Sequence, residues 1–303
     1  MIFLIAFVAG MMVRRKLLKA EHVRGLSIVT INILLPSLIY SKITENLYPE
    51  EFPIWWMLPL IAIATAGIGI GIAWLVWRKK LEEKRNLLPL SGIMNAAYFI
   101  LPIGQVIYPG QFDQFALYVA LYVLGISPLV WSFGKLFVTE HKKGENIWRG
   151  MITPPLLANF IGLAIVLGGL RQYVPVFISD GISLLGQATV PVATLILGAT
   201  IGALPWKFKS LLKDLSITVI IKLILVPAIV IFALYLSPLP ERYPLLSNLL
   251  VLEASAPAAT AMIIQIRRYG GDEKKAGSIL LVSYLACLVL IPFWLALWSS
   301  INP

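Results

Sequence analysis

Residues 86–102 read NLLPLSGIMNAAYFILP, and residues 248–264 read NLLVLEASAPAATAMII. An offset of 162 residues aligns the Asn-Leu-Leu triplet and the Ala-Ala pair of one stretch with those of the other. Each stretch is apolar overall and carries a proline, Pro102 or Pro257, close to small and polar residues. This pairing predicts two copies of one structural unit, each with a proline inside a hydrophobic segment.

The composition predicts that these segments lie in lipid. Of the 303 residues, 59% are hydrophobic and 13% are charged, a balance too apolar for a soluble fold. A spanning helix needs about 20 apolar residues, so the chain can hold ten spans with no separate soluble domain. Ten apolar stretches occur, at residues 1–13, 23–43, 54–77, 86–108, 113–137, 150–169, 174–202, 211–236, 245–266 and 276–298. We expect an all-α integral membrane protein with ten transmembrane helices in a single polytopic domain, residues 1–303.

Positive residues are concentrated in every second connection between these stretches. Of the 25 Lys and Arg residues, 21 fall in the connections at residues 14–24, 78–85, 135–149, 207–213 and 267–275. The positive-inside rule places these connections in the cytoplasm, which puts both termini outside the inner (plasma) membrane. Membrane topology thus explains the net charge of +10, and we do not expect nucleic acid as a partner.

The repeat extends over five spans in each half, residues 1–149 and 150–303. Pro36 in the second span corresponds to Pro191 in the seventh. Because five is an odd number, the second copy must be inverted in the membrane. Inverted repeats are typical of secondary transporters, whose substrate sites lie near the bilayer midplane at the repeat interface.

The prolines of the fourth and ninth spans predict interrupted helices. A proline removes a backbone donor, and the freed polar groups are tolerated in a membrane where they face a cavity. Such breaks can hold an ion, although each proline could also produce a simple kink, the interpretation we prefer for Pro227. The candidate substrate-binding residues of the two spans are Asn95, Tyr98, Pro102, Ser255, Pro257 and Thr260.

Two ionisable side chains fall well inside predicted spans, Lys222 in the eighth and Glu253 in the ninth. Charge within a membrane is unfavourable, so both are candidate functional residues. Glu253 could carry a coupling proton or form a structural pair with Lys222. Lys222 could set the electrostatics of an anion site or extend toward the cytoplasmic boundary. The sequence leaves these alternatives open.

Residues that would indicate other functions are missing from the sequence. His22 and His141 lie in different basic connections, Cys287 is the single cysteine, and no Ser-His-Asp arrangement, zinc motif or Walker loop occurs. We therefore expect no enzyme activity, no cofactor and no metal. Gly67 and Gly71 follow no strand, so we interpret them as helix-packing positions rather than a nucleotide fingerprint.

Four motifs resemble those of the auxin efflux carrier family, which includes the plant PIN-formed carriers and bacterial carriers of the malonate type. They are NILLPSLIYSKI in the second span, NAAYFILPIG in the fourth, KLILVP in the eighth, and SAPAATAMIIQIRRYGGDEKKAGSILLVSYLACLVLIP across the ninth and tenth. The similarity covers essentially the whole chain. It implies ten helices with outside termini, the topology that the charges also predict.

The resemblance further implies a fold like that of bile-acid transporters and antiporters. A scaffold would consist of spans 1, 2, 6 and 7, and a transport unit of spans 3–5 and 8–10, with spans 4 and 9 crossing at their breaks. Asn95 would face a small organic anion, a carboxylate, carried by an elevator mechanism. Proton or sodium coupling and a homodimer through the scaffold helices stay open, as does a coupled carrier of another solute. A channel is a further alternative.

Overall fold

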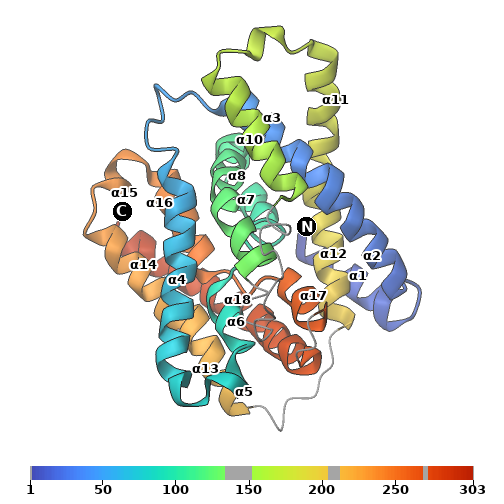
Figure 1. The fold of residues 1–303 in the computed structure, drawn as a ribbon, viewed down its shortest axis with the longest axis vertical. Helices are drawn as coiled ribbons and strands as arrows, with labels where there is room; N and C mark the ends of the chain where they lie inside the picture. Colours follow the sequence, from blue (N-terminus) through green and yellow to red (C-terminus); the bar gives the residue numbers. More distant parts are fainter. Residues whose placement is uncertain (1, 134–151, 204–211, 269–271, 303) are drawn as a thin grey trace, which may run out of the picture. The chain divides into compact units, whose positions relative to one another are not determined.

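The computed structural model describes residues 2–133, 152–203, 212–268 and 272–302, and the named elements among them are all helices (Figure 1). The predicted all-α class is confirmed. Six helical stretches are long and apolar enough to cross a membrane: Ala20–Asn46, Met57–Lys84, Pro109–Trp131, Val176–Ala203, Leu212–Tyr235 and Glu273–Ile301. They make the protein a multi-pass membrane protein.

The other four predicted spans coincide with shorter helices. The first and sixth are α1 (Ile2–Arg14) and α10 (Pro154–Leu167). The fourth is divided between α6 (Leu87–Gly92) and α7 (Ile100–Ile107), and the ninth between α16 (Pro244–Ser255) and α17 (Ala261–Arg268). The count of ten spans therefore stays a prediction. The basic connection at 135–149 lies outside the described residues, and those at 207–213 and 267–275 are described only in part.

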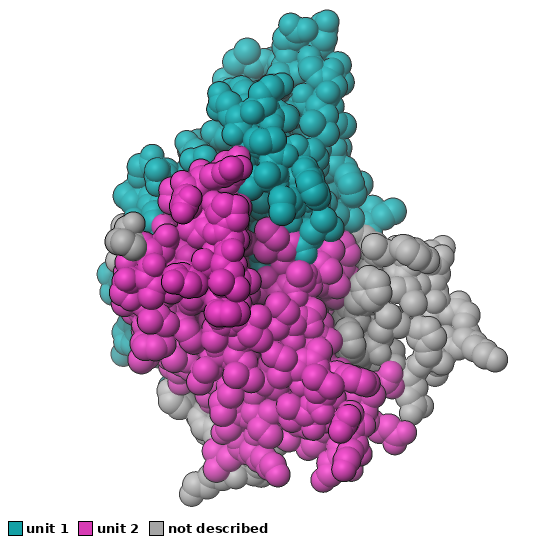
Figure 2. All heavy atoms as spheres, turned by 90° about the vertical axis from the view of Figure 1, so that its left-hand side faces the viewer, with its two compact units in different colours: residues 1–60, 97–127, 151–203 teal, residues 61–96, 128–150, 204–303 magenta. Residues whose placement is uncertain are grey.

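The chain divides into two compact units, which Figure 2 shows in different colours. Unit 1 contains Met1–Leu60, Ala97–Ser127 and Met151–Ala203. Its helices are α1, α2 (Ala20–Val29), η1 (Thr30–Leu34), α3 (Leu35–Asn46), α7, η3 (Pro109–Gln111), nearly all of α8 (Phe112–Pro128), α10, η6 (Arg171–Tyr173), α11 (Val176–Gln187) and α12 (Thr189–Ala203).

Unit 2 contains Ile61–Ala96, Pro128–Gly150 and Leu204–Pro303. Its helices are most of α4 (Met57–Trp77), η2 (Arg78–Lys80), α5 (Leu81–Lys84), α6, η4 (Leu129–Phe133), α13 (Leu212–Ile220), η7 (Ile221–Leu225), α14 (Val226–Tyr235), α15 (Leu239–Arg242), α16, α17 and α18 (Glu273–Ile301). The proposed repeats, 1–149 and 150–303, divide the chain differently and remain a prediction.

Small residues let helix backbones approach closely in both units. In unit 1, a Cβ atom on Gly198 of α12 would lie 2.4 Å from the Cα atom of Ala6 in α1. In unit 2, a Cβ atom on Gly69 of α4 would lie 2.7 Å from the Cα atom of Gly92. The prediction for Gly67 and Gly71 was wrong, because a Cβ atom there meets nothing within 4 Å. Each is two residues from Gly69, about 200° around the helix, and so faces away from that contact.

Pro227 does not interrupt its helix, which continues from Leu212 to Tyr235. A proline cannot donate to the carbonyl four residues earlier, here that of Leu223. The indole Nε1–H of Trp294 on α18 donates to this carbonyl at 2.8 Å. A side chain from a neighbouring helix of unit 2 thus satisfies the carbonyl that Pro227 leaves without its backbone donor.

Candidate functional site

Two non-helical segments of unit 2 meet. Residues 93–96 follow α6, and residues 256–260 separate α16 from α17. The segments form an antiparallel β-bridge, and the backbone N–H of Asn95 donates to the carbonyl of Pro257 at 2.9 Å. These two residues are the positions that the offset of 162 aligns. The two similar stretches therefore contact each other at equivalent positions.

Side chains of unit 2 satisfy the end of α16. Because this helix stops at Ser255, the carbonyls of Ala254 and Ser255 lack the donors that a following helical turn would supply. The ammonium of Lys222, in η7, donates to the carbonyl of Ala254 at 3.2 Å. The thiol of Cys287, in α18, donates to the carbonyl of Ser255 at 3.5 Å. A cation at the C-terminal end of a helix also interacts favourably with the helix dipole. Lys222 therefore stabilises the end of α16 both by a hydrogen bond and by its charge.

Asn95 is held by a residue that the sequence reasoning missed. Its amide Nδ2 donates to the hydroxyl of Tyr284 on α18 at 2.5 Å, and Asn95 is only 5% exposed. Tyr284 lies one helical turn before Cys287, so one face of α18 contacts both the first non-helical segment and the last residue of α16, Ser255. The repeat contained a usable signal, since the offset of 162 relates Tyr284 to Tyr122, a polar aromatic residue in another predicted span.

Glu253 lies in the last turn of α16 and is fully buried. Within the described ranges, neither of its carboxyl oxygens has a hydrogen-bond partner. Lys222 is also buried, but its ammonium bonds to the carbonyl of Ala254 rather than to this carboxylate. Buried carboxyl groups without partners are unfavourable and therefore rare, which keeps Glu253 a candidate for ion coupling.

The remaining predicted residues differ in their surroundings. Ser255 is fully buried, and its hydroxyl donates within its own helix to the carbonyl of Val251 at 2.7 Å. Thr260 is half-buried at the end of its non-helical segment. Tyr98 and Pro102 belong to unit 1, where Pro102 is buried in the first turn of α7. The Tyr98 hydroxyl is buried without a hydrogen-bond partner among the described residues.

Unit 2 thus brings together six of the eight predicted residues near its two non-helical segments: Asn95, Lys222, Glu253, Ser255, Pro257 and Thr260. The part of the chain that the structure describes contains no group of three His, Cys, Asp or Glu side chains that could hold a metal ion. The available chemistry is an amide, an ammonium, a carboxyl group and helix ends. The amide and the ammonium are hydrogen-bond donors, and the carboxyl group can take up or release a proton.

Comparison with known proteins identifies relatives along nearly the whole chain. The family described as membrane transport protein matches residues 1–147 and 143–295. An uncharacterized transporter of Methanocaldococcus jannaschii is 26% identical over 288 residues, 92% of this chain and 90% of that protein. An uncharacterized transporter of Methanothermobacter thermautotrophicus is 25% identical over 285 residues, 90% of this chain and 88% of that protein. The chain therefore belongs to the membrane transport protein family, the auxin efflux carrier family that its motifs resemble.

Proposed function

We propose that this protein is a secondary carrier of a small organic anion, a carboxylate, which crosses the inner membrane by an elevator type of alternating access. In this proposal ten spans form two inverted repeats with both termini outside. The fourth and ninth spans are broken helices that cross at Asn95 and Pro257. The backbone pairing of these two residues is the main support for the proposal. An antiparallel pair of segments has a local two-fold axis, and the sequence repeat aligns the same two positions, as expected where two inverted repeats meet.

The groups at this pairing suit a carboxylate. The Asn95 amide is a donor that can turn from its present acceptor to a substrate oxygen. The first N–H groups of α17 follow the second non-helical segment, and the N-terminus of a helix favours an anion. Lys222 adds a positive charge in the same unit. Together these groups can compensate an anion that has left water.

Glu253 supports proton coupling as the preferred form of this transport. Its carboxyl group is buried without a partner among the residues described. Protonation removes a negative charge and so favours an anion nearby, which would link anion binding to proton binding. Sodium coupling, a different solute and a channel are the competing possibilities, and a channel would show no acceleration of uptake by substrate on the opposite side of the membrane.

The experiment that tests this function is radiolabelled uptake by purified protein in proteoliposomes. Malonate, succinate and acetate are compared, with and without imposed pH, sodium and voltage gradients. We expect saturable carboxylate uptake that a pH gradient stimulates. Asn95→Ala should abolish it, whereas Asn159→Ala is a matched control, because Asn159 is a buried amide of α10 that donates to its own helix. Absence of carboxylate uptake, or equal loss in both variants, would contradict the proposal.

A further inference from the structure

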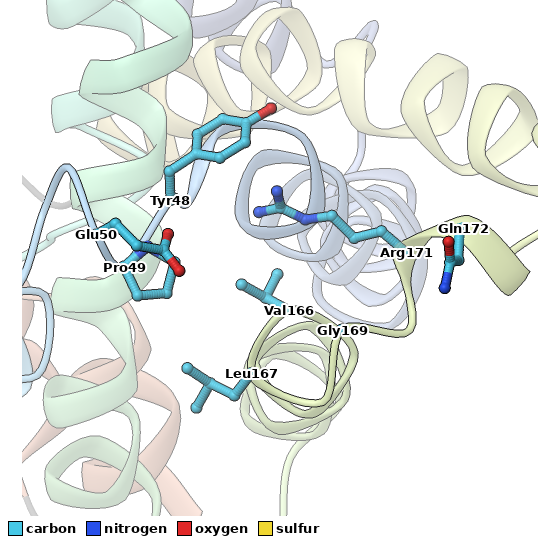
Figure 3. Close-up of a pocket in the computed structure, with 8 residues that line it drawn as sticks. All are labelled: Tyr48, Pro49, Glu50, Val166, Leu167, Gly169, Arg171 and Gln172. Atoms are coloured by element: carbon cyan, nitrogen blue, oxygen red, sulfur yellow. The ribbon is translucent and has the colours of Figure 1, made fainter.

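Unit 1 contains a cavity of about 430 Å³ beside the chain segment that follows α3. Its walls come from that segment, from the end of α10 with the turn after it, and from η6 (Figure 3). Gly169 has a φ of +65°, a conformation that favours glycine, at the turn where the chain leaves α10. The lining residues are Tyr48, Pro49, Glu50, Val166, Leu167, Gly169, Arg171 and Gln172.

Arg171 is held in one orientation at this cavity. Its guanidinium lies over the ring of Tyr48, 4.5 Å from the ring centroid, and one Nη atom donates to the carbonyl of Leu47. The Nε–H group is buried and has no hydrogen-bond partner among the described residues. A guanidinium that is fixed on one edge and has an unused donor is suited to the paired oxygens of a phosphate or carboxylate.

Glu50 lines the same cavity, and Figure 3 shows it on the side opposite Arg171. Within the described part of the chain, Glu50 and Arg171 form no ion pair with each other or with another residue. Val166 and Leu167 supply an apolar wall between them. A cavity with two unpaired opposite charges and an apolar wall fits a zwitterion that carries a hydrocarbon chain better than it fits a simple anion.

Aromatic residues near the cavity indicate its depth in the membrane. Tyr48 lines the cavity and Tyr173 follows the lining residue Gln172, and their exposed fractions are 46% and 73%. Exposed Tyr and Trp residues are enriched at the level of the lipid headgroups, where one part of the side chain is apolar and another part is hydrated. Leu167 is 55% exposed, so an apolar surface continues outward from the cavity for an acyl chain.

We propose that this cavity binds the headgroup of a zwitterionic phospholipid of the phosphatidylethanolamine type. The phosphate accepts hydrogen bonds from Arg171, the ammonium donates to Glu50, and an acyl chain lies along Leu167. Phosphatidylcholine should bind more weakly, because its quaternary nitrogen has no N–H to donate. Phosphatidylglycerol should also bind more weakly, because it brings a net negative charge to Glu50 and no cation. This site is independent of the proposed substrate and transport direction.

The test measures the melting temperature of the purified protein in detergent after each of the three lipids is added. Phosphatidylethanolamine should raise Tm by about 5 °C at saturation, and the other two lipids by clearly less. Glu50→Gln should remove the preference for phosphatidylethanolamine over phosphatidylcholine while keeping the contacts of Arg171. Arg171→Gln should remove the response to all three lipids. Glu51→Gln and Arg242→Gln are matched controls that remove one exposed charge outside the cavity and should respond like the wild type.

Other results would overturn the proposal. Equal stabilisation of the wild type by all three lipids would show no headgroup recognition. A larger effect of phosphatidylglycerol, strengthened by Glu50→Gln, would show a plain anion site. An equal response to glycerophosphoethanolamine, which has no acyl chains, would show a site for a soluble ligand. If Arg171→Gln does not fold, mass spectrometry of the lipids that copurify with the wild type and Glu50→Gln decides, since only the wild type should be enriched in phosphatidylethanolamine.

Discussion

Asn95 donates its side-chain amide to Tyr284, yet the proposed function requires that amide for the substrate. The amide has two N–H groups, and a bound carboxylate that takes the one now donated to Tyr284 would replace the tyrosine hydroxyl. Tyr284→Phe removes this competing acceptor. We expect carboxylate affinity to rise roughly 2- to 10-fold, the equivalent of one net hydrogen bond, and the Tm of the unliganded protein to fall. Tm and binding isotherms with malonate and succinate measure the two effects.

Tyr122→Phe is the matched control for this prediction. Tyr122 is the buried residue of α8 that the repeat offset aligns with Tyr284, but it lies in unit 1. Its substitution should alter stability without raising affinity. Weaker binding by Tyr284→Phe would show instead that the hydroxyl of Tyr284 contributes directly to substrate binding.

Glu253 allows a separate prediction about pH. If its carboxyl group exchanges the coupling proton, wild-type affinity for a carboxylate should strengthen as pH falls, because protonation removes a nearby negative charge. Glu253→Gln should bind well at every pH and lose most of this dependence. Affinity measured across pH for this variant and for Glu241→Gln, which removes an exposed acid of α15, tests the assignment. A stable Glu253→Gln protein with the wild-type pH profile would exclude the coupling role.

The sequence predicted some of these residues for a simple reason. Asn95, Lys222 and Glu253 stand out as polar residues in apolar stretches, and the repeat drew attention to Pro257. Their partners could not be predicted, because the contact of Tyr284 with Asn95 joins residues 189 positions apart. The bond from Lys222 to a backbone carbonyl depends on where α16 ends, which hydropathy does not specify.

The helices show why two similar prolines have different consequences. The helix around Pro227 continues, and Trp294 satisfies the carbonyl that this proline leaves free. Around Pro257 the helix stops at Ser255 and a new one begins at Ala261. The sequence predicted this difference from the small and polar neighbours of Pro257. It could not predict that Pro102 lies within α7, after the non-helical residues 93–99, rather than among them.

A comparison of proline variants tests the importance of this interruption. Pro257→Ala restores a backbone donor and favours a continuous helix through residues 256–260, so we expect uptake in proteoliposomes to fall at least tenfold. Pro227→Ala restores the donor where the helix is already continuous and should keep most activity. Similar losses in the two variants would show that Pro257 has no special role.

Another element-level prediction concerns one carboxylate that joins three helices of unit 2. Asp214 of α13 accepts from Lys84 of α5 at 2.7 Å and from Lys275 of α18 at 2.5 Å. Asp214→Asn leaves two ammonium groups close together without a counter-charge, so the unfolding free energy should fall by about 1–3 kcal/mol. Thermal or denaturant unfolding measures this change. Glu82 is an exposed acid of α5, so the control Glu82→Gln should have little effect on the unfolding free energy. An equally small effect of Asp214→Asn would show that its two bonds to lysine do not stabilise the unit.

At the scale of the whole molecule, composition predicted the membrane class because lipid requires long apolar helices. Six of the ten predicted stretches coincide with helices that satisfy this requirement by length and composition. Hydropathy could not predict the shorter helices, since an apolar stretch has the same composition whether its backbone is one helix or two. The division into units could not be predicted either. It places residues 93–96 in unit 2 and α7 in unit 1, although both belong to the single apolar stretch 86–108.

Topology provides the last prediction, because the charge pattern assigns every connection to one side. Cysteines are introduced at Lys80, Lys274 or Gln172 in a Cys287→Ser protein, a change that keeps a hydrogen-bond donor for the carbonyl of Ser255. All three positions are exposed, so protection must come from the membrane rather than from the fold. An impermeant maleimide should label Gln172→Cys in intact cells, and the two lysine positions only after the membrane is permeabilised. Labelling of Lys80→Cys or Lys274→Cys in intact cells would show that the ten-span arrangement with outside termini is wrong.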